Sequence, residues 1–345
     1  MNPSAYFEEV LSLISSAELL HTDRLSLAGR TVHLKTPSPG LRERLVPSLA
    51  HLIKPDDGSA PELTIWYATN KNLASKVKAP PWAGFNSQGY NPDLDQDEIQ
   101  IFFQPWQKQF FLYSRTKRTG IYWAQTPDEV PWWESTFSFR VLFHFWTYDL
   151  PAQLIHAGAL AHNGSGILIT GQSGSGKSTS CLQLLRRGFQ YLGDDYVWVE
   201  QENGGPSVHT LFQTAKVEPE NLHNRFHDWV PFVTNKDTYR DQKAIFHVHD
   251  LFPDSRLGQA KLKAILLPRV SGLEHTSFEK VNSSRALLAM APTTLHHLPH
   301  NRDISYKKLM EISASLPSYH WKLGYNLDAF FNSFKDFSTH ELSWN

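Results

Sequence analysis

A continuous apolar run at residues 166–170 interrupts the mixed polar and apolar pattern around it and predicts a buried strand. Residues 179–187 have the pattern of a helix, and Gly188 follows them as a suitable C-terminal cap. The segment between them, residues 171–178, is rich in glycine and serine. The pattern therefore predicts a strand, a tight loop and a helix in direct succession.

The first 150 residues show a different alternation of patterns. Apolar side chains at helical or alternating spacing predict helices over 3–20, 41–53 and 132–148. They predict strands over 24–35, with a turn at Gly29, and over 63–68, 99–103, 109–114 and 120–124. Residues 79–97 are rich in proline, glycine, asparagine and aspartate, which predicts a loop. We therefore expect an N-terminal α+β module over residues 1–150. An α/β domain is expected over residues 151–345, ending in helices near 306–316 and 327–334.

The loop between the predicted strand and helix reads Gly-Gln-Ser-Gly-Ser-Gly-Lys-Ser, a complete phosphate-binding loop. Its glycines allow backbone N–H groups to turn onto phosphate oxygens, and the helix N-terminus adds partial positive charge. Lys177 can then reach the β- and γ-phosphates, and Ser178 can offer its hydroxyl to Mg²⁺. The predicted nucleotide-binding residues are Gly171, Ser173, Gly174, Ser175, Gly176, Lys177, Ser178 and Thr179.

Two further features lie close to this loop in sequence. Asp194 and Asp195 follow the apolar end of a predicted strand, where a carboxylate beside a phosphate-binding loop can meet Mg²⁺. Adjacent residues on an extended chain point to opposite sides, so one can face the metal and the other the attacking group. An exposed Gly-Asp-Asp turn is the alternative. His156 stands alone in an apolar run before the loop, and such a histidine is more often structural.

Composition narrows the class of protein. The 345 residues carry a net charge of −1, which favours neither nucleic acid nor an anionic membrane as a partner. No segment reaches the ~20 consecutive apolar residues of a membrane span. The single cysteine, Cys181, excludes a disulfide framework and predicts a cytoplasmic protein.

Taken together, His156-Ala-Gly-Ala, the loop 171–178, Arg187-Gly188 and Leu192-Gly-Asp-Asp resemble the catalytic core of the HPr kinase/phosphorylase group. That group shares its core with phosphoenolpyruvate carboxykinases. Looser similarity at residues 243–248 and 262–269 extends to HPr-kinase-related serine kinases, including lasso-peptide precursor kinases. The resemblance implies an α/β P-loop kinase core of the HPr kinase/phosphoenolpyruvate carboxykinase type, preceded by the N-terminal α+β module.

The resemblance also implies roles for single residues. Lys177 and Ser178 would hold phosphates and Mg²⁺, and Asp194 would be the base that accepts the proton of an attacking hydroxyl. Asp195 would face the metal, and His156 would assist near the transferred phosphate. The resembled enzymes are oligomers, so a homo-oligomer is a candidate state.

The resemblance does not reach the whole of the downstream region. The Glu-Ile-Arg-Gly-Leu-Gly segment of the bifunctional HPr enzymes is missing after the aspartate pair, so HPr is not implied as the acceptor. Arg225, Arg240 and Lys243 occupy the corresponding stretch. Cations there can contact the transferred phosphate, or they can be ordinary surface charge.

These observations predict an ATP- and Mg²⁺-dependent kinase. It would move the γ-phosphate to a hydroxyl, with serine as the expected residue, on a peptide, small protein or small molecule. The alternative is a nucleotide-gated binding or regulatory protein with little turnover. The second carboxylate of the aspartate pair favours the kinase, because a gate needs only the carboxylate on the metal side.

Overall fold

The computed structural model describes residues 2–94, 98–342 and 344. The chain divides into two compact units. Unit 1 contains Met1–Leu150 together with His296–Arg302, and unit 2 contains Pro151–Leu295 and Asp303–Asn345. The hydrophobic pattern of the sequence does not predict the short return of the chain into unit 1 at His296–Arg302.

Unit 1 is built on a mixed sheet whose strands follow the order β1-β2-β3-β6-β5-β4 in the described residues. The strands are β1 (His21–Leu27), β2 (Arg30–Thr36), β3 (Leu63–Thr69), β4 (Ile99–Gln104), β5 (Gln109–Ser114) and β6 (Thr119–Ala124). Strands β1 and β2 form a hairpin around Ala28 and Gly29, which both have positive φ. The strands predicted for this region are therefore present, and the turn predicted at Gly29 separates β1 from β2.

The helices of unit 1 differ more from the predictions. They are α1 (Pro3–Ser15), α2 (Pro39–Leu45), α3 (Trp132–Thr136) and α4 (Arg140–Trp146). The single helix predicted over 132–148 is wrong, because Phe139 adopts a left-handed conformation with a φ of 59° between α3 and α4. The predicted loop 79–97 contains one short turn of helix at Pro92–Leu94, and residues 95–97 lie outside the described part.

Unit 2 contains a larger sheet in which β10, β8, β9, β15, β12, β11 and β7 are successive neighbours, and β17 joins β15 to β16. The strands are β7 (Ala152–Ile155), β8 (Gly158–His162), β9 (Ser165–Ile169), β10 (Gln190–Gly193), β11 (Val197–Glu202), β12 (Gly205–His209), β15 (Gln259–Val270), β16 (Ser277–Val281) and β17 (Ser318–Leu323). A separate ribbon pairs β13 (Thr214–Val217) with β14 (Ala244–His247).

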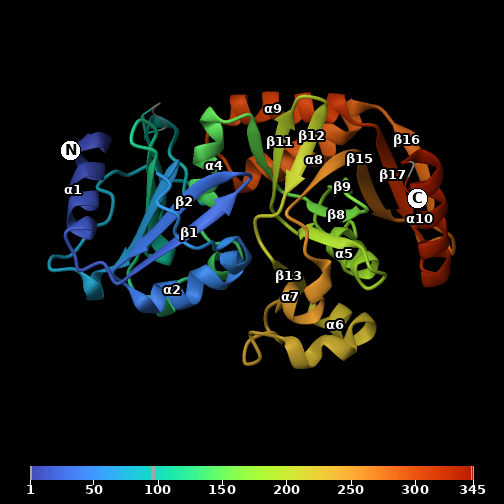
Figure 1. The fold of residues 1–345 in the computed structure, drawn as a ribbon, viewed down its shortest axis with the longest axis horizontal. Coiled ribbons are helices and arrows are strands. Elements are labelled where there is room, and N and C mark those ends of the chain that lie inside the picture. Colours follow the sequence, from blue (N-terminus) through green and yellow to red (C-terminus); the bar gives the residue numbers. More distant parts are fainter. Residues whose placement is uncertain (1, 95–97, 343, 345) are drawn as a thin grey trace. The chain divides into compact units, whose positions relative to one another are not determined.

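Helices cover both faces of this sheet (Figure 1). α8 (Ser283–His297) and α9 (Arg302–Ser315) supply Met290, Leu309 and other apolar side chains to the core that includes Leu168. α5 (Lys177–Leu185) and α10 (Leu327–Glu341) pack in the core that includes Ile167 and Ile169. Because neighbouring β9 side chains alternate between two buried faces, the strand reads as a continuous apolar run.

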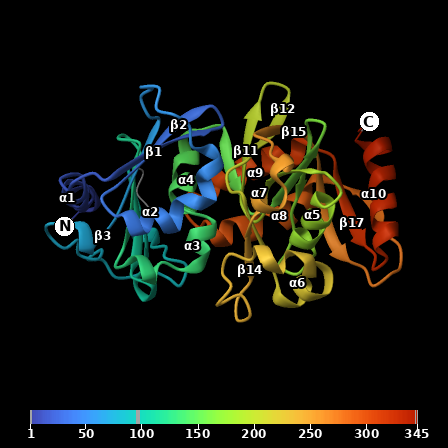
Figure 2. The same cartoon turned by 60° about the horizontal axis from the view of Figure 1, so that its bottom comes forward.

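The remaining elements of unit 2 are short. α6 (Pro219–Arg225) lies beside α5 (Figure 2), where Arg186 donates to the Arg225 carbonyl at 2.9 Å. α7 (Val248–Leu251) follows β14. Short 3₁₀ turns occur at Val46–Leu52, Asn70–Asn72, Pro92–Leu94, Pro105–Gln107, Pro127–Glu129, Thr147–Asp149, His227–Phe232 and Pro253–Ser255. Among the described helices, none has the length and apolar character to cross a bilayer.

Candidate active site

The predicted strand–loop–helix unit is present as β9, the loop 170–176 and α5. Gly171, Gly174 and Gly176 have φ values of 153°, 77° and 101°, which side chains other than glycine rarely adopt. Gly176 is also closely packed, because a Cβ placed there would lie 2.5 Å from Cδ1 of Leu323. The loop is therefore held in a fixed conformation at the N-terminus of α5, as a phosphate cradle requires.

Lys177 is the first residue of α5 and is only 6% exposed. Its ammonium donates hydrogen bonds to the carbonyl oxygens of Gly171 at 2.8 Å and Gln172 at 3.0 Å. Burial lowers the pKa of Lys177, and the nearby Asp194 and Asp195 act in the opposite direction. The lysine thus lies over the loop whose phosphate ligand it would contact.

Asp194 follows the last strand residue of β10 and is almost completely buried. Burial raises its pKa to about 6, and the charge of Asp195 adds to the effect, whereas the Ser178 hydroxyl, Lys216 and Lys177 lower it. Neither carboxylate oxygen makes a hydrogen bond of good geometry to the described residues, although Ser178 is close enough to affect the pKa. A buried carboxylate in this state is suited to receive a proton or a cation.

Asp195 lies in a different environment, because its φ of 68° turns the chain sharply after Asp194. One carboxylate oxygen lies 3.3 Å from Nε2 of His156 and the other lies 2.6 Å from Nζ of Lys216. Burial raises the pKa of Asp195, but Lys216 and His156 outweigh it and hold this pKa well below the usual range. The two neighbouring aspartates therefore have opposite protonation behaviour.

His156 lies between β7 and β8, at the end of β8 that neighbours the phosphate loop. The backbone N–H of Ala157 donates to the Asp195 carbonyl at 3.1 Å, which fixes this segment against the aspartate pair. The structure thus brings together His156, Lys177 and both aspartates, although they come from one helix and two separate strand connections. His156 contacts Asp195 and not the residue expected to be the base.

Lys216 was missed in the sequence analysis. It lies on β13, about twenty residues beyond the aspartate pair, in the alternating segment Thr-Ala-Lys-Val. Alternation places its side chain opposite those of the buried Ala215 and Val217, and this was the one signal available. Nothing in the sequence showed that β13 runs past Asp195.

The three other cations are placed differently from one another. Lys243 forms an ion pair with Glu218 at 2.9 Å, and Asp195 and Asp194 contribute to its raised pKa after Glu218. Arg225 lines a cavity beside α5, together with Thr179 and Gln183. Arg240 is exposed in the segment before β14, and no described contact brings it to the loop or the aspartates.

The residues present fit a divalent cation through oxygen ligands. Ser178 and the aspartates offer one hydroxyl and two carboxylates, the ligand type that Mg²⁺ prefers, and Mg²⁺ usually takes only one or two protein carboxylates. Both Asp194 oxygens are buried without hydrogen bonds to the described residues. Across those residues no group of three or more His, Cys, Asp or Glu side chains is placed to hold a metal alone, so the remaining ligands would be phosphate oxygens and water.

Comparison with known proteins points to one family for this region. Residues 150–214 match the HPr Serine kinase C-terminal domain. The resemblance stated from the sequence is therefore confirmed over the segment that contains His156, the phosphate loop and both aspartates. This segment also contains Thr214, the first residue of β13, and ends two residues before Lys216.

Curated proteins similar to this chain are HPr kinase/phosphorylases. The chain is 42% identical over 58 residues to an HPr kinase/phosphorylase of Geobacillus sp. (strain WCH70), covering 17% of this chain and 19% of the relative. It is 43% identical over 53 residues to an HPr kinase/phosphorylase of Bacillus mycoides (strain KBAB4), covering 15% and 17%. The matched region thus spans less than a fifth of these relatives.

A solved structure of the HPr(Ser) kinase/phosphatase from Coxiella burnetii was also found. It shares 16% identity, and the comparison covers 55% of this chain and 97% of that one, with a TM-score of 0.30. The α/β character of unit 2 and its phosphate loop rest on the elements described above.

Proposed function

We propose that unit 2 is an ATP- and Mg²⁺-dependent phosphotransferase that moves the γ-phosphate to a hydroxyl of a peptide, small protein or small molecule. The observation that carries this proposal is the convergence of the loop lysine, Lys177, with two carboxylates of different pKa within a segment matching the HPr serine kinase C-terminal domain. Serine is the expected acceptor residue, because the matching family is a serine kinase family.

In this proposal the loop N–H groups and Lys177 bind the β- and γ-phosphates. Ser178 and Asp195 hold Mg²⁺, which when bound supplies positive charge to neutralise the phosphate oxygens. Asp194 accepts the proton of the attacking hydroxyl. The new bond forms between that oxygen and the γ-phosphorus, and the bond from the γ-phosphorus to the bridging oxygen breaks, so that ADP leaves with the electron pair.

The pKa of about 6 supports Asp194 as the base, because a carboxylate whose pKa is near neutral pH accepts a proton more readily than a carboxylate with the usual pKa. His156 and Lys216 would act through Asp195 by keeping it ionised.

Two contacts favour the reverse assignment of the carboxylates. The hydroxyl of Ser178, the proposed metal ligand, lies close enough to Asp194 to lower its pKa. His156 and Lys216 contact Asp195, so that Asp195 would be the carboxylate on the acceptor side and Asp194 the one on the metal side. The family of reactions is the same in both assignments, but the two aspartates exchange roles.

The test is transfer of labelled γ-phosphate from ATP to candidate acceptors by the wild type, Asp194→Asn and Asp195→Asn. We expect transfer by the wild type. The variant that lacks the base should bind Mg·ATP normally and lose about 10²–10⁴ in rate. The variant that lacks the metal ligand should be partly recovered by high Mg²⁺ or Mn²⁺. If the reverse assignment holds, these two phenotypes will be exchanged.

A nucleotide-gated binding protein with little turnover is the competing proposal. It predicts that the wild type binds Mg·ATP and that the phosphate stays on the nucleotide with every acceptor. It also predicts that substitution of one aspartate has no effect beyond binding, since a gate needs only the carboxylate on the metal side. Acceptor phosphorylation that disappears in either variant with Mg·ATP affinity intact would exclude the gate.

A further inference from the structure

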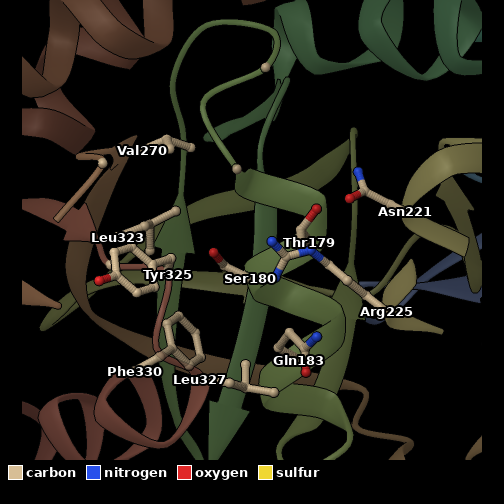
Figure 3. A pocket seen from close by; sticks show the side chains of 14 residues that line it. Thr179, Ser180, Gln183, Asn221, Arg225, Val270, Leu323, Tyr325, Leu327 and Phe330 are labelled. Atoms are coloured by element: carbon tan, nitrogen blue, oxygen red, sulfur yellow. The ribbon is translucent and has the colours of Figure 1, made fainter. Parts of the chain in front are cut away.

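A cavity of about 260 Å³ in unit 2 lies beside α5 and outside the group formed by His156 and the aspartates. Its floor is the helix surface that carries Thr179, Ser180 and Gln183 (Figure 3). Apolar side chains line one wall, and polar side chains from α6 line the other. The first wall contains Leu323, Tyr325, Leu327 and Phe330, and the second contains Asn221 and Arg225.

The apolar wall is rigid because two chain connections are hydrogen-bonded to each other. The N–H of Ser271 donates to the Leu323 carbonyl at 3.0 Å, and the N–H of Tyr325 donates to the Leu273 carbonyl at 3.0 Å. At Gly324 a Cβ would collide with the Glu274 backbone, so the two connections are packed directly on one another. The cavity is therefore formed before any ligand enters.

The cavity begins at the phosphate loop itself. Gly174 and Gly176 belong to its lining, and Leu323 packs closely on Gly176. Ser178 and the buried Asp194 are not among its lining residues. Asp194 instead lies by Gly158, where a Cβ would be 3.3 Å from its Oδ1. The loop thus has the carboxylates at one side and this apolar cavity at the other.

A bound nucleoside triphosphate has to extend in one direction from the loop. Its γ-phosphate lies by Lys177 and the carboxylates if the proposed function is correct, so the nucleoside lies at the other end of the triphosphate. An acceptor side chain would have to reach the carboxylates instead. We propose that the cavity holds the nucleobase, against the rings of Tyr325 and Phe330, and this rests on the proposed function.

The chemistry of the walls fits a base. An aromatic ring offers a stacking surface, and Tyr325 is 69% exposed at the rim, so its ring is available to a ligand. The polar edge of a base would face the amides of Gln183 and Asn221 and the guanidinium of Arg225, which Figure 3 shows reaching toward Thr179. These residues lie on α5, on α6 and beyond residue 320, and all but those of α5 are outside the segment 150–214.

The experiment compares Mg·ATP with Mg·tripolyphosphate, which has the phosphates but no nucleoside, by calorimetry. We expect Tyr325→Ala to weaken Mg·ATP binding about 5- to 100-fold, the range for loss of one aromatic–base stack, and to leave tripolyphosphate binding unchanged. The matched control is Tyr306→Ala, which removes another exposed tyrosine ring, on α9 and outside the cavity lining. It should change neither affinity.

A second measurement needs no variant. Photolabelling of the wild type with 8-azido-ATP should attach the base to a peptide from residues 179–183, 221–225 or 323–330. The inference is overturned if Tyr325→Ala leaves the ratio of the two affinities unchanged, or if the label lies outside these peptides. If the wild type binds neither compound, the proposed function itself fails. Binding of both compounds with equal affinity would support the phosphate site and contradict the nucleobase site.

Discussion

At the scale of single residues, Asp194 and Asp195 show how environment sets chemistry. The two side chains are identical and adjacent, yet burial raises the pKa of the first while Lys216 and His156 lower that of the second. Two neighbouring carboxyl groups have different pKa values because the negative charge of the one that ionises first makes ionisation of the other less favourable. A pair of this kind can hold one proton near neutral pH and keep one permanent negative charge.

The raised pKa of Asp194 predicts an effect on stability. The unfolded value is about 3.9, so the folded state binds the proton more tightly. Asp194 therefore makes its full contribution to the stability of the folded protein below about pH 4, and this contribution is lost as the pH rises through about 6. Asp194→Asn, which cannot ionise, should gain stability relative to the wild type over that interval, by about 1–3 kcal/mol.

Denaturant unfolding of both proteins between pH 4 and 8 measures this difference. The free energy of unfolding of the variant relative to the wild type should rise from pH 4 to 6 and then stay level. A constant difference at every pH would mean that Asp194 titrates normally in the folded protein. Activity is expected to fall while stability increases, as is common where a site holds strained or unpaired groups.

At the scale of elements, the local pattern identified the strand, loop and helix at residues 165–185 because each part is encoded by neighbouring residues. The predictions failed where tertiary contacts decide. The helix expected over 132–148 is broken at Phe139, a bulky residue in a left-handed conformation that propensity disfavours. Lys216 was not predicted, because its place beside Asp195 depends on how β13 packs and not on its spacing in the sequence.

Gly158 on β8 provides a test of this packing. A Cβ there would lie 2.6 Å from the Sγ of Cys181 on α5, so the strand and the helix have no room for a methyl group. We expect Gly158→Ala to lower the free energy of unfolding by about 1–3 kcal/mol, the usual cost of overpacking. Cys181→Ala removes the sulfur, and in that background the same substitution should cost much less.

A double-mutant cycle in denaturant separates this contact from the others. The double variant should have a higher free energy of unfolding than the sum of the two single effects predicts, because the loss of the sulfur removes the clash. Additivity of the two substitutions would show that the clash is with another group, such as Asp194 Oδ1 at 3.3 Å. Gly258→Ala is the control for glycine loss, because no atom lies within 4 Å of a Cβ there and its backbone, like that of Gly158, is not in the left-handed region.

At the scale of the whole molecule, the division into two units does not follow the chain order. His296–Arg302 belongs to unit 1, although it connects α8 and α9 of unit 2. Within unit 1, Nε2 of His300 lies 2.9 Å from the Ile101 carbonyl, and Nε2 of His144 lies 2.9 Å from the His300 carbonyl. The local sequence does not predict this return of the chain, because the segment has the composition of an ordinary proline-containing loop.

This division predicts the behaviour of a fragment. Residues 151–345 produced alone lack the rest of unit 1, so 296–302 should lose its hydrogen-bonding partners. Hydrogen exchange should be fast across 296–302 in the fragment and slow in the full chain, where Leu298 and His300 are buried. The amides of β9 should be protected equally in both. Equal protection of 296–302 would contradict the assignment of this segment to unit 1.

The most direct test of the central claim is calorimetric titration of Mg·ATP into the wild type and Lys177→Ala, with Lys307→Ala as a control at an exposed lysine of α9. The account predicts saturable binding by the wild type and by Lys307→Ala. Lys177→Ala should keep its fold and bind about 10- to 100-fold more weakly, because it loses a charged contact to the phosphates. Absence of binding to the wild type, or equal affinity in a folded Lys177→Ala protein, would contradict the account.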